Sequence, residues 1–183
     1  MDLGSLADRL RRRTVEVTSA GHAAGAGVVW APGWIVTNAH VIRHPRVAVR
    51  FAEGRCEDGV VVANDRKADL AVLRVPDAGP AAAIADVSDT LRVGSIVVAV
   101  GHPFGMRGAF TAGIVHAVGP ITSGGRSWIQ ADLKLAPGNS GGPLADARGR
   151  LRGLNAMTVG NLALAIPVSE VRCFVRAAGG PLA

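Results

Sequence analysis

The stretch APGNSGGP, residues 136–143, is the most informative part of this 183-residue chain. It sets Ser140 among glycines, which indicates a tight turn. Glycines let a backbone approach a substrate closely, and such a turn can aim successive N–H groups at one point, as an oxyanion hole requires. The same composition suits an ordinary loop, because the chain contains 24 glycines. The segment alone leaves a catalytic and a structural interpretation open.

A serine hydroxyl becomes a nucleophile beside a base, which is itself oriented by an acid. Residues 138–142 also fit the nucleophile elbow of α/β-hydrolases, in which the acid and then the histidine follow the serine. No histidine follows Ser140, so that interpretation is excluded. The partner must come earlier in the chain, and the candidates are His22, His40, His44, His102 and His116.

Two earlier segments supply a histidine and an acid in suitable contexts. Residues 25–42 read as a β-hairpin whose second strand delivers His40 at its end. Asp69 opens the apolar run 69–75, where an unpaired carboxylate would be costly to bury. The other histidines carry no motif, and His102 is expected to be a turn residue in a Gly/Pro loop. His40 and Asp69 are therefore the candidates for base and orienting acid.

Short segments rich in Val, Ile and Leu, separated by Gly and Pro turn signals, make up most of the chain. We expect strands at residues 15–19, 27–30, 34–38, 46–52, 60–63, 70–75, 95–100, 110–118, 128–133, 151–157 and 162–166. Strands at this spacing favour an all-β barrel or sandwich over alternating βα units. Amphipathic helices are expected at 2–13 and 169–178. The Pro/Ala-rich stretch 76–85 is the one plausible boundary between two lobes.

Composition limits the classes of function. Hydrophobic residues make up 49% and charged residues 19%, which excludes intrinsic disorder. The net charge is +6, but the basic residues are scattered and the chain has three Trp, four Phe and no Tyr, so nucleic acid is not expected as a partner. Cys56 and Cys173 belong to no metal-binding spacing, so we expect neither a metal nor a cofactor.

The N-terminal segment and the apolar runs bear on location. Residues 96–100 form the longest strongly apolar run, which is too short to span a bilayer. Arg11, Arg12 and Arg13 are not followed by the apolar region of a secretory signal. From the sequence we expect a cytoplasmic location, or an extracytoplasmic one if a leader has been removed.

The order His, Asp, Ser with these flanking residues resembles the chymotrypsin-like serine proteases, and more narrowly the HtrA/Deg proteases. The resemblance rests on TNAHV at 37–41, ADLAVL at 68–73 and PGNSGGPL at 137–144. The supporting segments are GHPFG at 101–105, TAGIV at 111–115, IQAD at 129–132 and ALAIP at 163–167. Together they run in the family's order from about residue 25 to residue 167, which is nearly the whole chain.

The resemblance implies an all-β fold of two six-stranded antiparallel β-barrels with short N- and C-terminal helices. Residues 1–183 would form one trypsin-like protease domain. Its parts would be a helix and strand at 1–24, a first barrel at about 25–78, a second barrel at about 86–167 and a helix at 168–183. Residues 76–85 would then form the crossing between the barrels.

The resemblance also implies roles for individual residues. His40 would be the general base, Asp69 its orienting acid and Ser140 the nucleophile. Backbone N–H groups of Gly138, Asn139 and Ser140 would form the oxyanion hole, with Gly138 and Ser140 as its donors and Asn139 between them setting the turn.

Residues before the oxyanion loop should border the S1 pocket, which receives the P1 residue that precedes the cleaved bond. The expected lining is Lys134, Leu135 and Ala136 on one side, opposite Leu162, Ala163 and Leu164. Apolar walls favour small aliphatic P1 residues such as Val, Ala or Leu. An ammonium group of Lys134 pointing into the pocket would favour acidic P1 residues instead.

We therefore expect a serine endopeptidase that cleaves unfolded or exposed segments of other proteins through an acyl-enzyme, in protein quality control. The alternative is a latent or inactive protease-fold module for binding or chaperone work, which needs an activating partner. The family often trimerises through N-terminal aromatic residues, and none precedes residue 25 here. A monomer is therefore expected rather than a trimer.

Overall fold

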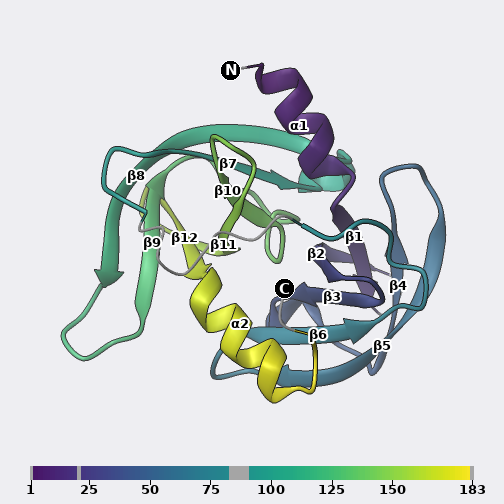
Figure 1. The fold of residues 1–183 in the computed structure, drawn as a ribbon. Coiled ribbons are helices and arrows are strands. Elements are labelled where there is room, and N and C mark those ends of the chain that lie inside the picture. Colours follow the sequence, from purple (N-terminus) through teal and green to yellow (C-terminus); the bar gives the residue numbers. More distant parts are fainter. Residues whose placement is uncertain (1, 20–21, 83–90, 182–183) are drawn as a thin grey trace.

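The computed structural model describes residues 2–19, 22–82 and 91–181. In this part of the chain twelve strands form two closed barrels of six strands each. The barrels lie side by side (Figure 1), and every strand pair within them is antiparallel. The fold implied by the resemblance is confirmed.

The first barrel has the strand order β1-β2-β3-β6-β5-β4. Its strands are β1 (Thr14–Ser19), β2 (His22–Ala31), β3 (Trp34–Thr37), β4 (Arg46–Arg50), β5 (Cys56–Asp65) and β6 (Leu70–Arg74). Alternation decides which side chains enter the core: in β4, Val47 and Val49 are buried between exposed neighbours. Because β1 pairs with both β2 and β4, the barrel begins at Thr14 rather than near residue 25 as expected.

The second barrel has the strand order β10-β11-β12-β9-β8-β7. Its strands are β7 (Ile96–Gly101), β8 (Ala109–Pro120), β9 (Ser127–Asp132), β10 (Pro143–Asp146), β11 (Leu151–Val159) and β12 (Leu162–Pro167). The sequence analysis missed β10, because four residues that begin with proline after a glycine-rich loop show no alternation. β10 nevertheless closes the barrel by pairing with β7 and β11.

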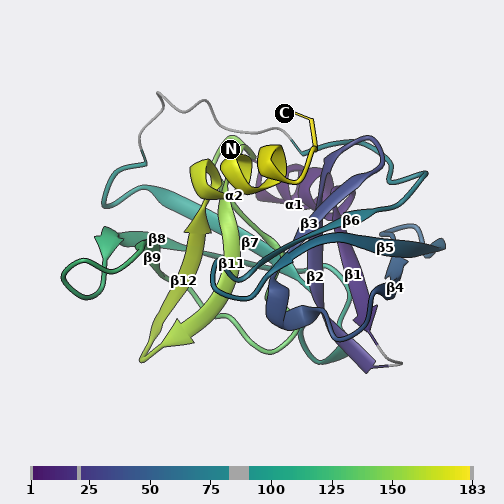
Figure 2. The ribbon, with the colours of Figure 1, turned by 90° about the horizontal axis from the view of Figure 1, so that it is seen from below.

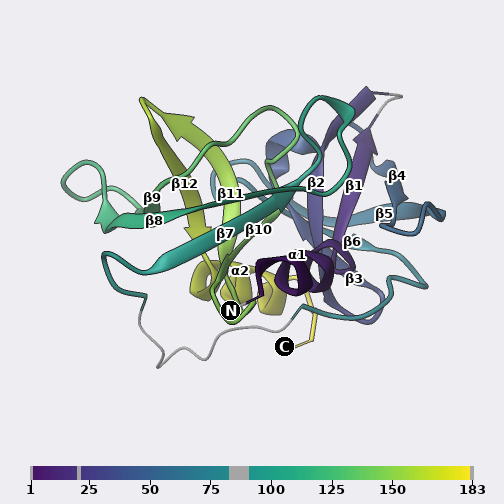
Figure 3. The ribbon, with the colours of Figure 1, turned by 90° about the horizontal axis from the view of Figure 1, so that it is seen from above.

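Two helices bridge the barrels. Helix α1 (Leu3–Arg11) contacts β1 and β7, and helix α2 (Val168–Ala177) contacts β6, β11 and β12. Figures 2 and 3 show both helices on the same side of the molecule, across the boundary between the barrels. Leu6 and Leu10 of α1 pack against Val98 and Val100 of β7. Each helix therefore helps to fix one barrel against the other.

The crossing expected at residues 76–85 lies partly outside the described residues, which stop at 82 and resume at 91. Cys56 and Cys173 are both exposed free thiols. No helix in the described part of the chain is long and apolar enough to cross a bilayer.

Asp146, at the end of β10, is a buried carboxylate that holds the turn between β10 and β11. Its Oδ1 accepts the N–H groups of Arg148 and Arg150 at 2.9 and 3.1 Å. Its Oδ2 accepts Nε–H of Arg150 and of Arg152 at 2.9 and 3.0 Å. Burial alone would raise the pKa of Asp146, but the hydrogen bonds from Arg150 and Arg148 outweigh it and hold the pKa below its ordinary value.

Asp146→Asn is expected to lower the free energy of unfolding at neutral pH, because an amide cannot pair with two guanidinium groups. In the wild type the unfolded carboxyl binds protons more readily than the folded one. The stabilisation is therefore complete above the unfolded pKa of about 3.9 and is lost as the pH falls through the lower, folded pKa. Urea unfolding of both proteins from neutral to strongly acidic pH should show stabilities that converge in acid. A difference that does not change with pH would contradict this account.

Candidate active site

His40 and Asp69 meet at one end of the first barrel. His40 lies on the 3₁₀ turn η1 (Ala39–Val41) just after β3, and Asp69 directly precedes β6. These two strands pair with Thr37 opposite Ala71, so the two residues come to the same edge. His40 Nδ1 lies 2.9 Å from both carboxylate oxygens of Asp69. The backbone N–H of His40 donates to Oδ1 at 3.1 Å, so the carboxylate holds both the ring and the turn.

Asp69 adopts an unusual backbone conformation, with φ at +52°. Such a conformation in a residue other than glycine costs on the order of 1–3 kcal/mol and needs support from its surroundings. The fully buried Asn38 supplies that support, because its Nδ2–H donates to the Asp69 carbonyl at 2.9 Å. The sequence analysis did not single out Asn38, although its place two residues before His40 could have drawn attention to it.

Ser140 lies on the loop that leads into β10, and glycines set the path of that loop. Gly138 has φ at +106° and Gly141 has φ at +83°. A Cβ at Gly141 would lie 2.1 Å from the Ala26 carbonyl oxygen, so only glycine fits there. The N–H of Ala26 donates to the Ser140 carbonyl at 2.8 Å, which ties the serine of the second barrel to β2 of the first.

The Ser140 hydroxyl donates to the carbonyl of Ala156 in β11 at 3.0 Å. No hydrogen bond joins Ser140 to His40 within the described residues. Both side chains nevertheless line one cavity of about 500 Å³, to which the two barrels contribute. The structure thus brings the three expected residues to one place, with the hydroxyl turned to a carbonyl.

The turn at residues 137–140 leaves two N–H groups without an acceptor. Neither Gly138 N–H nor Ser140 N–H donates to any group of the described residues, so both can serve a ligand oxygen. Asn139 is different, because its N–H donates to the Ala136 carbonyl at 3.0 Å. Of the three expected oxyanion-hole N–H groups, that of Asn139 is thus already engaged in closing the turn.

The wall of the cavity next to Ser140 differs in part from the expected S1 pocket. Leu135 and Ala136 line it as expected, but the opposite side is formed by Ala156, Met157 and Thr158 of β11. The expected residues of β12 do not line it: Leu162, Ala163 and Leu164. Ala163 and Leu164 are each 2% exposed, because β12 lies between β11 and β9 in the barrel wall.

Lys134 lines a neighbouring cavity of about 670 Å³ and not the one at Ser140. That cavity also contains Asp132, Phe104, Met106 and Phe110. The ammonium group therefore does not line the space beside the serine, and the walls there are mostly apolar.

Comparisons with known proteins agree with this geometry. Residues 25–154 match the family model described as the trypsin-like peptidase domain. The chain is 38% identical over 164 residues to the periplasmic serine endoprotease DegP of Salmonella typhimurium, covering 82% of this chain and 34% of that protein. It is 39% identical over 139 residues to the periplasmic pH-dependent serine endoprotease DegQ of Escherichia coli, covering 72% of this chain and 30% of that protein.

A solved structure extends the likeness to the whole fold. The crystal structure of the serine endoprotease from Yersinia pestis superposes with a TM-score of 0.88 at 29% identity, covering 97% of this chain and 66% of that one. The chain thus spans about a third of the length of these two curated relatives.

Proposed function

Because the chain belongs to the HtrA/Deg branch of the trypsin-like serine proteases, we propose that it is a serine endopeptidase that hydrolyses peptide bonds in protein substrates. The observation that carries the proposal is the single cavity lined by His40 and Ser140, beside the N–H groups of Gly138 and Ser140. The Asp69 carboxylate, 2.9 Å from His40 Nδ1, completes the proposed catalytic triad.

The proposed reaction follows from these contacts. With Nδ1–H donating to Asp69, Nε2 of His40 is free to accept the proton of the Ser140 hydroxyl. The serine oxygen attacks the scissile carbonyl, whose oxygen becomes negative and accepts the N–H groups of Gly138 and Ser140. His40 then gives the proton to the leaving amine. Water activated by the same imidazole hydrolyses the acyl-enzyme and restores the serine.

One observation supports the alternative of a latent form that an activating partner converts. The Ser140 hydroxyl is bound to the Ala156 carbonyl and must turn about its Cα–Cβ bond to reach His40. In the latent form, substrate or partner binding would supply the free energy for that turn. The net contribution of one hydrogen bond is about 0.5–1.5 kcal/mol, so the free energy that binding must supply to turn the hydroxyl is small.

The substrates we propose are unfolded or exposed segments of other proteins, in a quality-control role. The apolar lining by Leu135, Ala136 and Ala156 supports small aliphatic P1 residues. The cytoplasmic location expected from the sequence finds no support among the relatives, two of which are named as periplasmic.

A fluorophosphonate probe, which reacts with activated serines, tests the proposed nucleophile. We expect it to label the wild type, and we expect Ser140→Ala to abolish labelling and to lower peptide hydrolysis by roughly 10⁴-fold or more. Ser123→Ala is the matched control, because Ser123 is an exposed serine that also precedes two glycines. Labelling that persists in Ser140→Ala would contradict the proposal, and a folded but unlabelled wild type would support the latent form.

A peptide library tests the P1 preference. We expect cleavage after Val, Ala and Leu in both the wild type and Lys134→Ala, since Lys134 lines the neighbouring cavity. Met157→Ala should admit larger P1 side chains, because Met157 lines the cavity beside Ser140. Cleavage after Asp or Glu that disappears in Lys134→Ala would overturn the assignment.

A further inference from the structure

The loop of residues 102–108 lies directly against the oxyanion loop. The N–H of His102 donates to the Gly138 carbonyl at 3.0 Å, and the N–H of Phe104 donates to the Pro137 carbonyl at 3.4 Å. A Cβ on Gly138 would lie 2.3 Å from the His102 carbonyl oxygen, so the two backbones are in close contact. The position of Gly138 therefore depends on the conformation of residues 102–108.

This loop is strained and needs support. Phe104, within the 3₁₀ turn η2 (Pro103–Gly105), has φ at +52°, which is uncommon outside glycine. Its side chain is 76% exposed, so packing of the ring does not hold the conformation. The support must come from the residues on either side.

The imidazole of His102 supplies one support. It is 7% exposed, and its Nδ1 accepts the N–H of Gly108 at 3.2 Å, which closes the loop on itself. Burial lowers the pKa of His102, which favours the neutral ring that this acceptor role requires. On the other side of the ring, the buried Nε2 faces the backbone of Val15, so the bond from Gly108 fixes the side of the ring that faces the loop.

Arg11 supplies the other support, from the far end of the sequence. Its Nε–H donates to the Gly108 carbonyl at 2.7 Å, across 97 residues of chain. The N-terminal helix that carries Arg11 is anchored on β7 by Leu6 and Leu10. One continuous set of contacts thus leads from α1 through Gly108 and His102 to Gly138.

We propose that His102 and Arg11 are positioning residues for the oxyanion hole: they fix the loop of residues 102–108, whose backbone fixes Gly138. The proposal rests on the proposed function. Neither side chain lines the cavity at Ser140, so both act through Gly138. Loss of either support displaces an N–H that is needed in the transition state, and substrate binding is largely retained.

Peptide hydrolysis by His102→Ala and His102→Asn tests this role. An asparagine Oδ1 can accept the Gly108 N–H, whereas alanine cannot. We expect His102→Ala to lower kcat about 10- to 100-fold with little change in KM, because one oxyanion donor is worth up to about 10³-fold. His102→Asn should recover most of kcat, and Arg11→Ala should resemble His102→Ala more weakly. His116→Ala, at an exposed histidine of β8, is the control.

Hydrogen exchange at residues 136–142 gives a readout that does not depend on activity. His102→Ala should speed exchange there while Tm stays close to that of the wild type. Unchanged kcat and exchange in His102→Ala, or no recovery by His102→Asn, would overturn the proposal. If the fluorophosphonate probe does not label the wild type, that result counts against the proposed function. It does not count against the positioning role, because hydrogen exchange measures that role without relying on activity.

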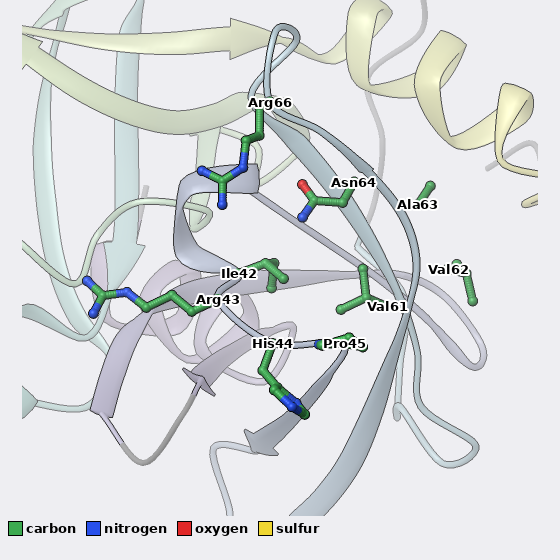
Figure 4. A pocket seen from close by; sticks show the side chains of 9 residues that line it. All are labelled: Ile42, Arg43, His44, Pro45, Val61, Val62, Ala63, Asn64 and Arg66. Atoms are coloured by element: carbon green, nitrogen blue, oxygen red, sulfur yellow. The ribbon is translucent and has the colours of Figure 1, made fainter.

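A different set of contacts concerns the substrate. A pocket of about 370 Å³ lies between residues 42–45, which follow the turn of His40, and residues 61–66 at the end of β5 (Figure 4). Ile42 and Val61 form an apolar wall, and Ile42 is itself 3% exposed and part of the first-barrel core. Arg43 and Arg66 extend to the same side of the pocket (Figure 4).

The two guanidinium groups have no acidic partner in the described part of the chain. The carboxylates closest in sequence make other contacts: Asp65 Oδ1 accepts the N–H groups of Lys67 and Ala68, and Asp69 holds His40. Arginine is suited to bidentate pairing with a carboxylate, so the open positions fit an acidic side chain.

We infer that this pocket is a subsite for Asp or Glu of the substrate, and this inference also rests on the proposed function. Arg43 is three residues after His40, and Arg66 is three residues before Asp69. Three residues span at most about 11 Å, so the acidic residue would lie within about four positions of the scissile bond in an extended substrate.

Paired peptides with Glu or Gln at successive positions around the scissile bond test the subsite. We expect one Glu peptide to have a kcat/KM about fivefold above its Gln counterpart, with an advantage that shrinks as salt increases. The double variant Arg43→Gln, Arg66→Gln should abolish the advantage while probe labelling and Gln-peptide cleavage persist. Arg46→Gln, an exposed arginine of β4, is the control. Equal cleavage of all pairs by the wild type, or an advantage kept in the double variant, would overturn the inference.

Discussion

The N–H of Ala26 donates to the carbonyl of Ser140 at 2.8 Å, and this bond joins the two barrels where the candidate site lies. The two backbones approach each other so closely at this bond that Gly25 and Gly141 beside it leave no room for a Cβ. A Cβ at Gly25 would lie 2.7 Å from the Ser140 carbonyl oxygen, and one at Gly141 would lie 2.1 Å from the Ala26 carbonyl oxygen. The glycines on both sides of the contact are therefore a condition for bringing a serine of one barrel next to a histidine of the other.

The two barrels that this contact joins contribute different parts of the candidate site. The first supplies the rigid pair of His40 and Asp69, fixed by strand pairing and by Asn38. The second supplies a glycine-rich loop that carries Ser140, the proposed nucleophile, and two N–H groups that no group of the described residues accepts. Backbone hydrogen bonds from neighbouring segments hold this loop in place. Ala26 of β2 donates to the Ser140 carbonyl, and His102 of the loop 102–108 donates to the Gly138 carbonyl.

The parts of this arrangement that the sequence could predict are those encoded locally. Alternating Val and Ile mark the strands, and the flanks of His40, Asp69 and Ser140 carry the family resemblance. The parts that were missed depend on contacts between distant segments. Nothing near Arg11 indicates a bond to Gly108, and the pocket wall was assigned to β12 because strand register cannot be read from the apolar run 162–166. The bond from the Asn139 N–H to the Ala136 carbonyl was not predicted either, because it exists only once the turn has formed.

The Ser140 hydroxyl and the N–H groups of Gly138 and Ser140 differ in whether they already have a hydrogen-bond partner in the described part of the protein. In the resting arrangement Ser140 satisfies its hydroxyl on Ala156, while Gly138 and Ser140 offer N–H groups that no group of the described chain accepts. In the proposed reaction these N–H groups bond to an oxygen whose negative charge develops toward the tetrahedral intermediate, and hydrogen bonds to a charged acceptor are stronger than those to a neutral one. Interactions made there and not in the resting state lower the barrier rather than merely tightening binding. In the proposed function, the N–H groups of Gly138 and Ser140 therefore contribute through bonds that strengthen in the transition state rather than through substrate binding alone.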